Sequence, residues 1–352
     1  MQKKKEVKAG TIRINSRNLK TYEKTKSGWK KSNKIFSNAL RVIKLFKANN
    51  NFSELKDKLN PQFLKGQFYH GKCQGARINI LPNGKKIDKA YSLFAEDLTI
   101  HDETSHNHWD VIYRNPNGKF AYCYTLNKKK KASKEKYNLV HEFEKKYSQI
   151  QKNAYTNLKT NENEIMPLAI ITLLKTYMRV GNEMFYKIHK SKGLTTLKKS
   201  DLTIKGNKVK FKYISKGGVP IEAEEEFPGT FIKNLKNHLS KIKENEFVFT
   251  GKDKKPLKDT DFEITFEEYC GVRFYPHIVR SFYATKEVEN FLKENKHPKK
   301  SQVKELFLAI SEKLGHKKFN KKHHEWECSS SVTISHYIDP KILETIENKI
   351  KK

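Results

Sequence analysis

One stretch of the chain decides its architecture. It reads Ile165-Met166-Pro167-Leu168-Ala169-Ile170-Ile171-Thr172-Leu173-Leu174-Lys175-Thr176-Tyr177 and continues as Met178-Arg179-Val180-Gly181-Asn182-Glu183. An almost continuous apolar run of helical length predicts a helix that is buried on all sides. Such a helix must be surrounded by other elements, so we expect it at the centre of the largest domain. The sequence that follows it then places Arg179 at the edge of this core.

The segments after this helix predict a mainly helical domain with one island of strand. Residues 208–214 alternate lysine with Val209, Phe211 and Tyr213, between turn signals at Gly206-Asn207 and Lys216-Gly217-Gly218. Period-two alternation next to glycine-containing turns is typical of a β-hairpin, which we expect at about 202–227. A last helix begins at Asp339-Pro340, a favourable N-cap followed by proline at the first helical position.

The N-terminal third of the chain has a different sequence pattern from the rest. Short runs such as Trp109-Asp110-Val111-Ile112-Tyr113 are separated by turn signals such as Asn115-Pro116-Asn117-Gly118, which predicts a small, mainly β domain. The first fifty residues are rich in Lys, Asn and Ser, with one apolar stripe that predicts a short helix near 39–48. We therefore expect an α+β chain with a basic arm at 1–52, a β-rich domain at 53–128 and a mainly helical domain at 129–352.

The charge of the chain indicates a polyanionic partner. Of its 352 residues, 72 are Lys or Arg and 39 are Asp or Glu, giving a formal net charge of +33. This excess is too large for an ordinary enzyme of small metabolites and is typical of nucleic-acid-binding proteins. Hydrophobic residues still make up 36% of the chain, which is enough to form cores. The N-terminus lacks the apolar region of a signal peptide, so we expect an intracellular protein.

The sequence also limits the chemistry that could act on DNA. It has no Walker lysine loop for ATP and no tight carboxylate cluster for two magnesium ions. The four cysteines form no CxxC pair, and His323, His324 and Cys328 have no second ligand pair, so we predict no metal and no cofactor. What remains is a side-chain nucleophile assisted by cations at phosphorus and an acid for the leaving oxygen.

Candidate residues for this chemistry follow one another in a fixed order. They lie in five short sequence motifs, which are Arg179-Val180-Gly181-Asn182-Glu183, Ser215-Lys216-Gly217-Gly218, His277-Ile278-Val279-Arg280, Leu314-Gly315-His316 and Ser335-His336-Tyr337. In this order, and in the word Gly193-Leu194-Thr195-Thr196-Leu197-Lys198, the sequence resembles the type IB DNA topoisomerases in their compact viral and bacterial form. The resemblance covers the C-terminal two-thirds of the chain.

The resemblance implies a role for each of five residues. Tyr337 would attack the scissile phosphorus and become linked to the 3′-phosphate, while Lys216 would protonate the departing 5′-oxygen. Arg179 and Arg280 would hold the non-bridging oxygens, and His316 would donate to one of them. The residue types suit these roles, because guanidinium groups bind phosphate through two parallel hydrogen bonds. Tyrosine, with an ordinary pKa of about 10, needs nearby cations to become a nucleophile.

The resemblance extends, more weakly, to DNA contacts. The segment Gly118-Lys119-Phe120-Ala121-Tyr122-Cys123-Tyr124 is similar to the family's DNA-contacting segment, so Lys119, Tyr122 and Tyr124 are candidate DNA-binding residues. Lys198, in the word shared with the family, is a fourth. A tyrosine-x-tyrosine strand is equally compatible with a place in the core.

The predicted function is relaxation of supercoiled duplex DNA without ATP or metal, through a transient 3′-phosphotyrosyl linkage and religation by the 5′-hydroxyl strand. The fold implied by the resemblance is that of tyrosine recombinases and type IB topoisomerases, with two domains forming a C-shaped clamp on DNA. We expect a monomer whose contacts with the DNA backbone are sensitive to salt. It would act with DNA in a nucleus, a viral factory or a bacterial cytoplasm, and in the virion as well if it is viral.

Two other functions compete with this one. His277-Ile278-Val279-Arg280 is the HxxR word of the tyrosine recombinases and integrases, which share the fold and the nucleophile. A non-catalytic, basic DNA-coating protein would also fit the charge. His316 and Tyr337 lie 21 residues apart, more than in poxvirus-type members, and residues 317–331 between them form either an ordered insertion or a flexible loop. Taken singly, Arg179 could cap a helix end and Lys216 could be an ordinary turn lysine.

Overall fold

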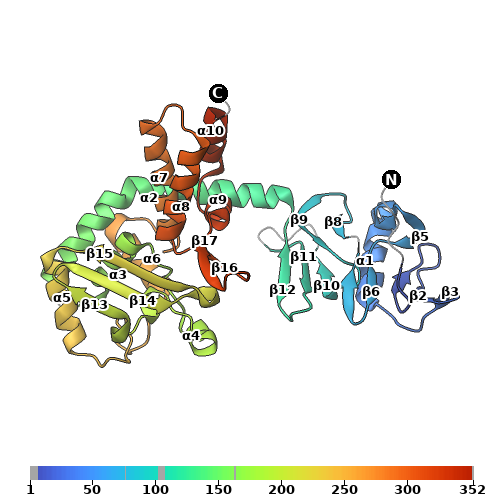
Figure 1. Cartoon of the computed structure of the whole chain (residues 1–352), viewed down its shortest axis with the longest axis horizontal. Coiled ribbons are helices and arrows are strands. Elements are labelled where there is room, and N and C mark those ends of the chain that lie inside the picture. The colour runs from blue at the N-terminus through green and yellow to red at the C-terminus, as the bar shows by residue number, and fades with distance from the viewer. Residues whose placement is uncertain (1–6, 76, 102–107, 162–163, 351–352) are drawn as a thin grey trace. The chain divides into compact units, whose positions relative to one another are not determined.

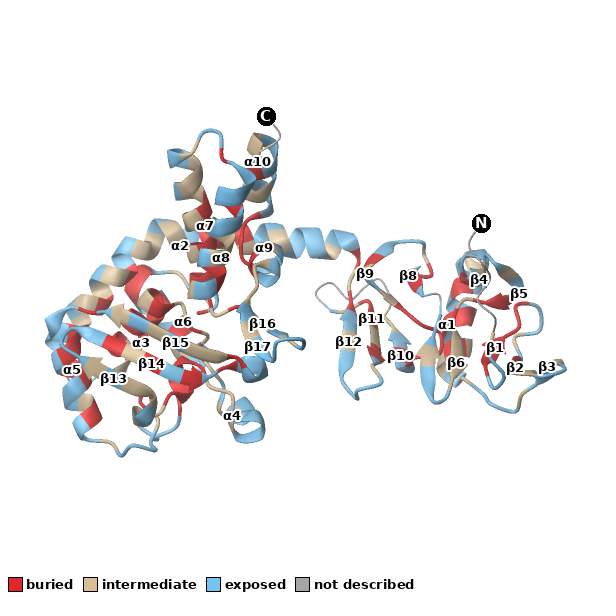
Figure 2. Ribbon diagram, in the orientation of Figure 1, coloured by how far each residue is buried: buried red, intermediate tan, exposed pale blue. Residues whose placement is uncertain are grey.

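The computed structural model describes residues 7–75, 77–101, 108–161 and 164–350, and it divides the chain into two compact units (Figure 1). Unit 1 ends at Glu135 and unit 2 begins at Lys136. The predicted α+β class is confirmed, because unit 1 is mainly β and unit 2 mainly helical. The boundary falls inside helix α2 (Leu126–Thr160), whose lysine-rich first turns are exposed (Figure 2).

Unit 1 is built from short antiparallel strands. A five-stranded sheet has the order β3-β2-β1-β6-β7, and a three-stranded sheet has the order β10-β11-β12. Two further pairs are β4 with β5 and β8 with β9. The bounds are β1 Ile12–Ile14, β2 Thr21–Thr25, β3 Gly28–Lys31, β4 Lys56–Asp57, β5 Asn60–Leu64, β6 Gln67–Tyr69, β7 Lys72–Gln74, β8 Ile78–Ile80, β9 Lys86–Tyr91, β10 Glu96–Ile100, β11 Val111–Arg114 and β12 Phe120–Cys123.

The predicted basic arm is wrong for the described residues 7–52, because these residues are folded. Strand β1 pairs with β2 and also with β6, more than fifty residues further along the chain. The predicted short helix is confirmed as α1 (Ser37–Ala48), and it buries Ala39, Val42, Ile43 and Phe46 in the core of unit 1. Residues 1–6 of the predicted arm lie outside the described residues.

Unit 2 contains most of the helices. Their bounds are α2 Leu126–Thr160, α3 Ile165–Thr176, α4 Glu183–His189, α5 Gly229–Ser240, α6 Asp259–Cys270, α7 Ile278–Glu294, α8 Lys300–Lys313, α9 Ser331–His336 and α10 Pro340–Ile350. Its strands are β13 Leu202–Lys205, β14 Lys208–Ile214, β15 Pro220–Glu226, β16 Lys317–Asn320 and β17 Glu325–Cys328. In the described part of the chain, no helix is long and apolar enough to span a bilayer.

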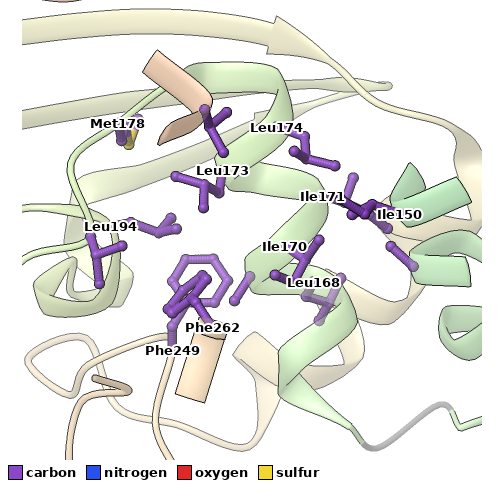
Figure 3. Close-up of a cluster of buried hydrophobic side chains, with 14 of the residues drawn as sticks. Ile150, Leu168, Ile170, Ile171, Leu173, Leu174, Met178, Leu194, Phe249 and Phe262 are labelled. Carbon is purple, nitrogen blue, oxygen red and sulfur yellow. The ribbon is translucent and has the colours of Figure 1, made fainter. Parts of the chain in front are cut away.

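Helix α3 lies at the centre of unit 2, as its composition predicts. Nearly all of its side chains are buried, and they pack against residues of several other elements, including Ile150, Leu194, Phe249 and Phe262 (Figure 3). The helix ends at Thr176, and the left-handed backbone of the next residue, Tyr177 (φ 54°), turns the chain out of the helix. This turn starts the segment that carries Arg179.

Antiparallel strands occur both before and after helix α7, which carries Arg280, along the chain. The region 202–227, predicted as a β-hairpin, forms a three-stranded antiparallel sheet, β13-β14-β15, whose strands are joined by two turns. Most of the segment 317–331 is also ordered, as the hairpin β16-β17, in which Phe319 is paired with Trp326. The structure therefore favours the ordered insertion over the flexible loop.

We predict that Phe46→Ala lowers the free energy of unfolding of unit 1 by about 3–5 kcal/mol, because it removes a fully buried ring from the core. The matched control is the adjacent Leu45→Ala, whose side chain is 41% exposed and whose effect should stay within about 0.5 kcal/mol. Urea unfolding followed by fluorescence can test this, since Trp29 and Trp109 lie in unit 1. Equal effects of the two substitutions would mean that this segment is an unfolded arm.

Candidate active site

Arg179 is positioned by the pairing of two short segments. After α3, Met178 and Val180 are buried and Arg179 between them is half-buried, so its side chain points away from the core. The backbone N–H of Leu194 donates to the carbonyl of Arg179 at 2.8 Å, and that of Thr195 donates to the carbonyl of Val180 at 2.6 Å. The two sequence motifs that resemble those of the topoisomerases, 179–183 and 193–198, are therefore paired with each other through their backbones.

This pairing brings two backbones unusually close together. A Cβ atom on Gly193 would lie 2.6 Å from the carbonyl oxygen of Arg179 and 2.7 Å from Gly181. Gly181 itself has a φ of 103°, a conformation that side chains rarely permit. Glycine at these two positions is thus required by the close approach that places Arg179.

Lys216 lies at the tip between β14 and β15. The tip residues Lys216–Gly218 are exposed, and Gly217 and Gly218 both have positive φ. Lys216 lines a cleft of about 320 Å³ together with Arg179 and His277. The tip is thus an exposed lysine that borders the same cleft as the arginine.

Arg280 is the most deeply buried charged group of the unit. It lies in the first turn of α7 with 2% of its surface exposed, and its guanidinium donates to the carbonyls of Tyr177 and Leu314, the latter at 2.8 Å. Its Nε–H has no hydrogen-bond partner among the described residues. Arg280 and Arg179 line a second cleft, of about 210 Å³. Burial, together with the charge of Arg179, lowers the pKa of Arg280 to about 10, so it stays charged at neutral pH.

His316 is held as a hydrogen-bond acceptor toward Arg280. Because a guanidinium can only donate, the 3.0 Å contact between Arg280 Nη2 and His316 Nε2 makes that nitrogen the acceptor. His316 Nδ1–H then donates to Thr333 Oγ1 at 2.8 Å. The Thr333 hydroxyl lies 2.6 Å from Ser311 Oγ, which donates to the carbonyl of Phe307. This chain of hydrogen bonds fixes one neutral tautomer.

The protonation of His316 agrees with this assignment. Burial, followed by the charges of Arg280 and Arg179, lowers the pKa of His316 to about 3. The side chain is therefore neutral at physiological pH. This differs from the role of phosphate donor that the resemblance implies, since in this structure Nε2 carries no proton to donate.

Tyr337 is assembled beside these groups. It follows α9 and is 5% exposed, and its hydroxyl lies 2.9 Å from His277 Nε2. Its ring lies 4.8 Å from that of His316, 5.2 Å from the guanidinium carbon of Arg280 and 5.5 Å from Lys136 Nζ. The phenol is thus in contact with two histidines and within cation–π distance of two cations.

His277 belongs to the site, although the sequence analysis did not propose it as a site residue. The signal was present in the HxxR word, where His277 precedes the helix that carries Arg280. Desolvation, followed by the charges of Arg280 and Arg179, lowers the pKa of His277 well below its ordinary value. A neutral imidazole can accept the Tyr337 hydroxyl proton.

The electrostatics of this cluster favour an anion. The charged side chains that shift the pKa values of His277 and His316 are all cationic, and Arg179 and Arg280 act on both histidines. Lys216 and Lys136 also act on His277. A tyrosine surrounded by cations and neutral histidines is suited to attack on a phosphate, whose charge the cations would neutralise.

Three of the predicted DNA-binding residues belong to unit 1 and the fourth, Lys198, to unit 2. In unit 1, Lys119 is exposed beside β12 and Tyr122 is 42% exposed, whereas Tyr124 is only half-buried after the strand. Phe120, two residues before Tyr122, is exposed on the same face, and the sequence analysis did not include it. In unit 2, Lys198 is half-buried, with its ammonium 5.7 Å from the ring of Tyr186 and 5.9 Å from that of Phe247. The role of these residues in DNA binding stays a prediction.

One group of side chains in the described residues has spacing that could suit a metal ion. It consists of His141, Glu144 and Glu289, outside the tyrosine cluster. The ammonium of Lys286 forms ion pairs with both carboxylates of this group. A cation is therefore already present where a metal would bind, and the group fits a structural network better than a metal site.

Comparison with known proteins identifies the class of this domain. Residues 125–347 match the family model described as the catalytic core of eukaryotic DNA topoisomerase I. The match covers more than half of the chain and contains every member of the tyrosine cluster. The chain therefore belongs to the DNA topoisomerase I family. A search of curated proteins found no match.

Solved structures of a recombinase show a limited similarity to the chain. XerH site-specific recombinase bound to palindromic difH substrate, in a post-cleavage complex, aligns with 16% identity and a TM-score of 0.36, covering 58% of this chain and 51% of the recombinase chain. The pre-cleavage complex of XerH with difH substrate aligns with 15% identity and a TM-score of 0.34, covering 56% and 52%. This chain thus spans about half the length of those recombinase chains.

We predict that Gly193→Ala destabilises unit 2 by about 1–3 kcal/mol, because the added methyl group would overlap backbone atoms of Arg179 and Gly181. Gly229→Ala is the matched control, since its Cβ would meet nothing within 4 Å. The control should be neutral or stabilising by about 0.5 kcal/mol. Thermal unfolding of both variants measures the difference. Equal stability of the two would show that the close approach of these segments does not constrain the fold.

Proposed function

We propose that the protein is a type IB topoisomerase, which relaxes supercoiled duplex DNA through a covalent link between Tyr337 and a 3′-phosphate. The observation that carries the proposal is the placement of the Tyr337 hydroxyl against neutral His277, within a cluster of cations. In the reaction, the phenol oxygen forms a bond to phosphorus and the bond to the 5′-oxygen breaks. Neither ATP nor a metal ion is needed to balance this exchange of ester bonds.

The proton of the phenol is transferred to His277 as the new bond forms. His277 Nε2 lies at hydrogen-bond distance from the hydroxyl, which is the geometry required of a general base. Its lowered pKa keeps it unprotonated at neutral pH. Religation by the 5′-hydroxyl strand returns this proton to Tyr337.

Arg179 and Arg280 bind the non-bridging oxygens of the scissile phosphate. The unused Nε–H of Arg280 offers a donor for one oxygen, and both arginines line the same cleft. Negative charge at this position would relieve the repulsion between the two guanidinium groups, so the site gains favourable interactions when phosphate enters. The fixed guanidinium geometry also orients the phosphate for attack.

His316 and Lys216 complete the cycle. For His316 to donate to a phosphate oxygen, Nε2 must gain a proton and Arg280 must turn its N–H group to the phosphate. The negative charge of the phosphate would raise the pKa of His316 and favour that change. Lys216, on its exposed glycine-rich tip, would supply the proton to the departing 5′-oxygen.

The partner is duplex DNA, bound mainly through its backbone by a monomer with a net charge of +33. The exposed aromatic face of β12, with Lys119 beside it, would add contacts from unit 1. The protein would act wherever this DNA is located: a nucleus, a viral factory or a bacterial cytoplasm. Rotation of the cut strand about the intact one, before religation, would release supercoils.

The first prediction of this mechanism is relaxation of negatively supercoiled plasmid in EDTA without ATP. Wild-type protein should relax the plasmid, and Tyr337→Phe should bind it without relaxing it, because only the nucleophilic oxygen is lost. A protein that forms a covalent adduct on a nicked duplex but relaxes no plasmid would instead be a tyrosine recombinase. Binding without either reaction would indicate a DNA-coating protein.

The second prediction concerns the general base. His277→Ala should slow single-turnover cleavage by about 10²-fold or more, because the phenol loses its proton acceptor. His297→Ala is the matched control, since His297 is an exposed histidine in the loop after α7, and it should cleave at the wild-type rate. Rates are measured with saturating protein on a nicked duplex. Cleavage by His277→Ala at the wild-type rate would exclude the proposed base.

A further inference from the structure

Helix α2 makes two polar contacts with the segment that carries Tyr337. The ammonium of Lys136 donates to the carbonyl of His336, immediately before the tyrosine. Five residues along the same helix, His141 Nε2 lies 3.2 Å from the carboxylate of Asp339, two residues after the tyrosine. The two contacts thus bracket Tyr337 in the sequence. Neither residue belongs to the set of five that the resemblance assigns.

The helix is well placed to act as a fixed support. Val140 lies one turn after Lys136 and Tyr137 one turn before His141, and both are buried in the core of unit 2. Asp339 is itself 4% exposed, so its carboxylate is held in one position. The face of α2 that makes the two contacts is therefore the face that packs into the unit.

Helix α7 holds the same segment from its own residues. Thr285 Oγ1 lies 3.3 Å from the carbonyl of Tyr337, to which it donates, and it accepts from the backbone N–H of Asp339 at 3.3 Å. Lys286, the next residue of α7, is ion-paired with Glu144 of α2. The two helices and the tyrosine segment are thus joined by a single polar network.

Lys136 does more than anchor the backbone. Its ammonium lies 5.5 Å from the centroid of the Tyr337 ring, and no carboxylate pairs with it among the described residues. Burial lowers the pKa of Lys136 to about 8, which marks the ammonium as partly withdrawn from water. Lys136 therefore adds a positive charge directly beside the ring of the proposed nucleophile.

We propose that Lys136 and His141 are positioning residues for the nucleophile, with Lys136 acting through the carbonyl of His336 and through its charge beside the Tyr337 ring. This inference rests on the proposed role of Tyr337 as nucleophile. His141 acts only through Asp339, and neither residue contacts the scissile phosphate. The lysine at the start of unit 2 is thereby a functional part of the active site.

The test is single-turnover cleavage of a nicked suicide duplex at saturating protein, with covalent adduct as the readout. Lys136→Met removes both the donor and the charge and should slow cleavage by about 10-fold to 100-fold, as a small displacement of a reacting group does. Lys136→Arg keeps both and should cleave within about threefold of wild type, whereas Lys136→Gln keeps only a donor and should fall between them.

Lys134→Met is the matched control, because Lys134 is exposed on the same helix and its loss removes the same charge. It should weaken DNA binding as much as Lys136→Met does but cleave at the wild-type rate. Melting temperatures are measured for every variant. If Lys136→Met does not fold, His141→Ala replaces it and should slow cleavage by about threefold to tenfold.

Three results would overturn the inference. Cleavage at the wild-type rate by folded Lys136→Met, or by His141→Ala where it replaces that variant, would show that the contacts of Lys136 and His141 do not position the tyrosine. Equal loss of rate in Lys136→Arg and Lys136→Met, at unchanged melting temperature, would show that neither the charge nor the donor matters. Absence of any adduct with wild-type protein would overturn the proposed function itself, and this role with it.

Discussion

The buried guanidinium of Arg280 joins the parts of the site. Its hydrogen bonds reach the carbonyl of Tyr177 at the end of α3, the carbonyl of Leu314 at the end of α8, and the ring of His316. A charge removed from water must be compensated by hydrogen bonds, so each of these segments is held at a fixed distance from α7. Arg179 follows the first segment, His316 the second, and the Tyr337 ring lies next to the guanidinium. The need to compensate the buried charge of Arg280 therefore determines the positions of four of the six groups of the proposed mechanism, which are Arg280 itself, Arg179, His316 and Tyr337.

The same arrangement leaves the site short of negative charge. Burial, followed by the charges of the two arginines, lowers the pKa of both histidines, and the arginines also repel each other, so the cluster is less stable alone than with an anion bound. Such a site gains its missing interactions when phosphate enters. In the proposed reaction, the unpaired cations of the site would then neutralise the charge that develops at phosphorus.

The parts of the fold that local sequence determines could be predicted, and those that depend on distant partners could not. The all-apolar α3, the alternating β14 and the Asp339-Pro340 start of α10 carry their structure in their own residues. The strands of residues 12–31 do not, because β1 is completed by β6 and buried Arg13 is paired with Asp57. In the site, five residues were recognised because they occur in sequence motifs that resemble those of the family, in the same order along the chain. The contact of His277 with Tyr337 spans 60 residues and that of Lys136 with His336 spans 200, and neither has a sequence pattern that shows its partner.

In the proposed mechanism Tyr337 is the nucleophile and the product of its attack is a 3′-phosphotyrosine. The most direct measurement is to trap the covalent adduct on a nicked suicide duplex, digest the protein and identify the modified peptide by mass spectrometry. We expect a nucleotide attached through its 3′-phosphate to Tyr337, together with a released strand that ends in a 5′-hydroxyl. Attachment to another residue, or linkage through a 5′-phosphate, would contradict it.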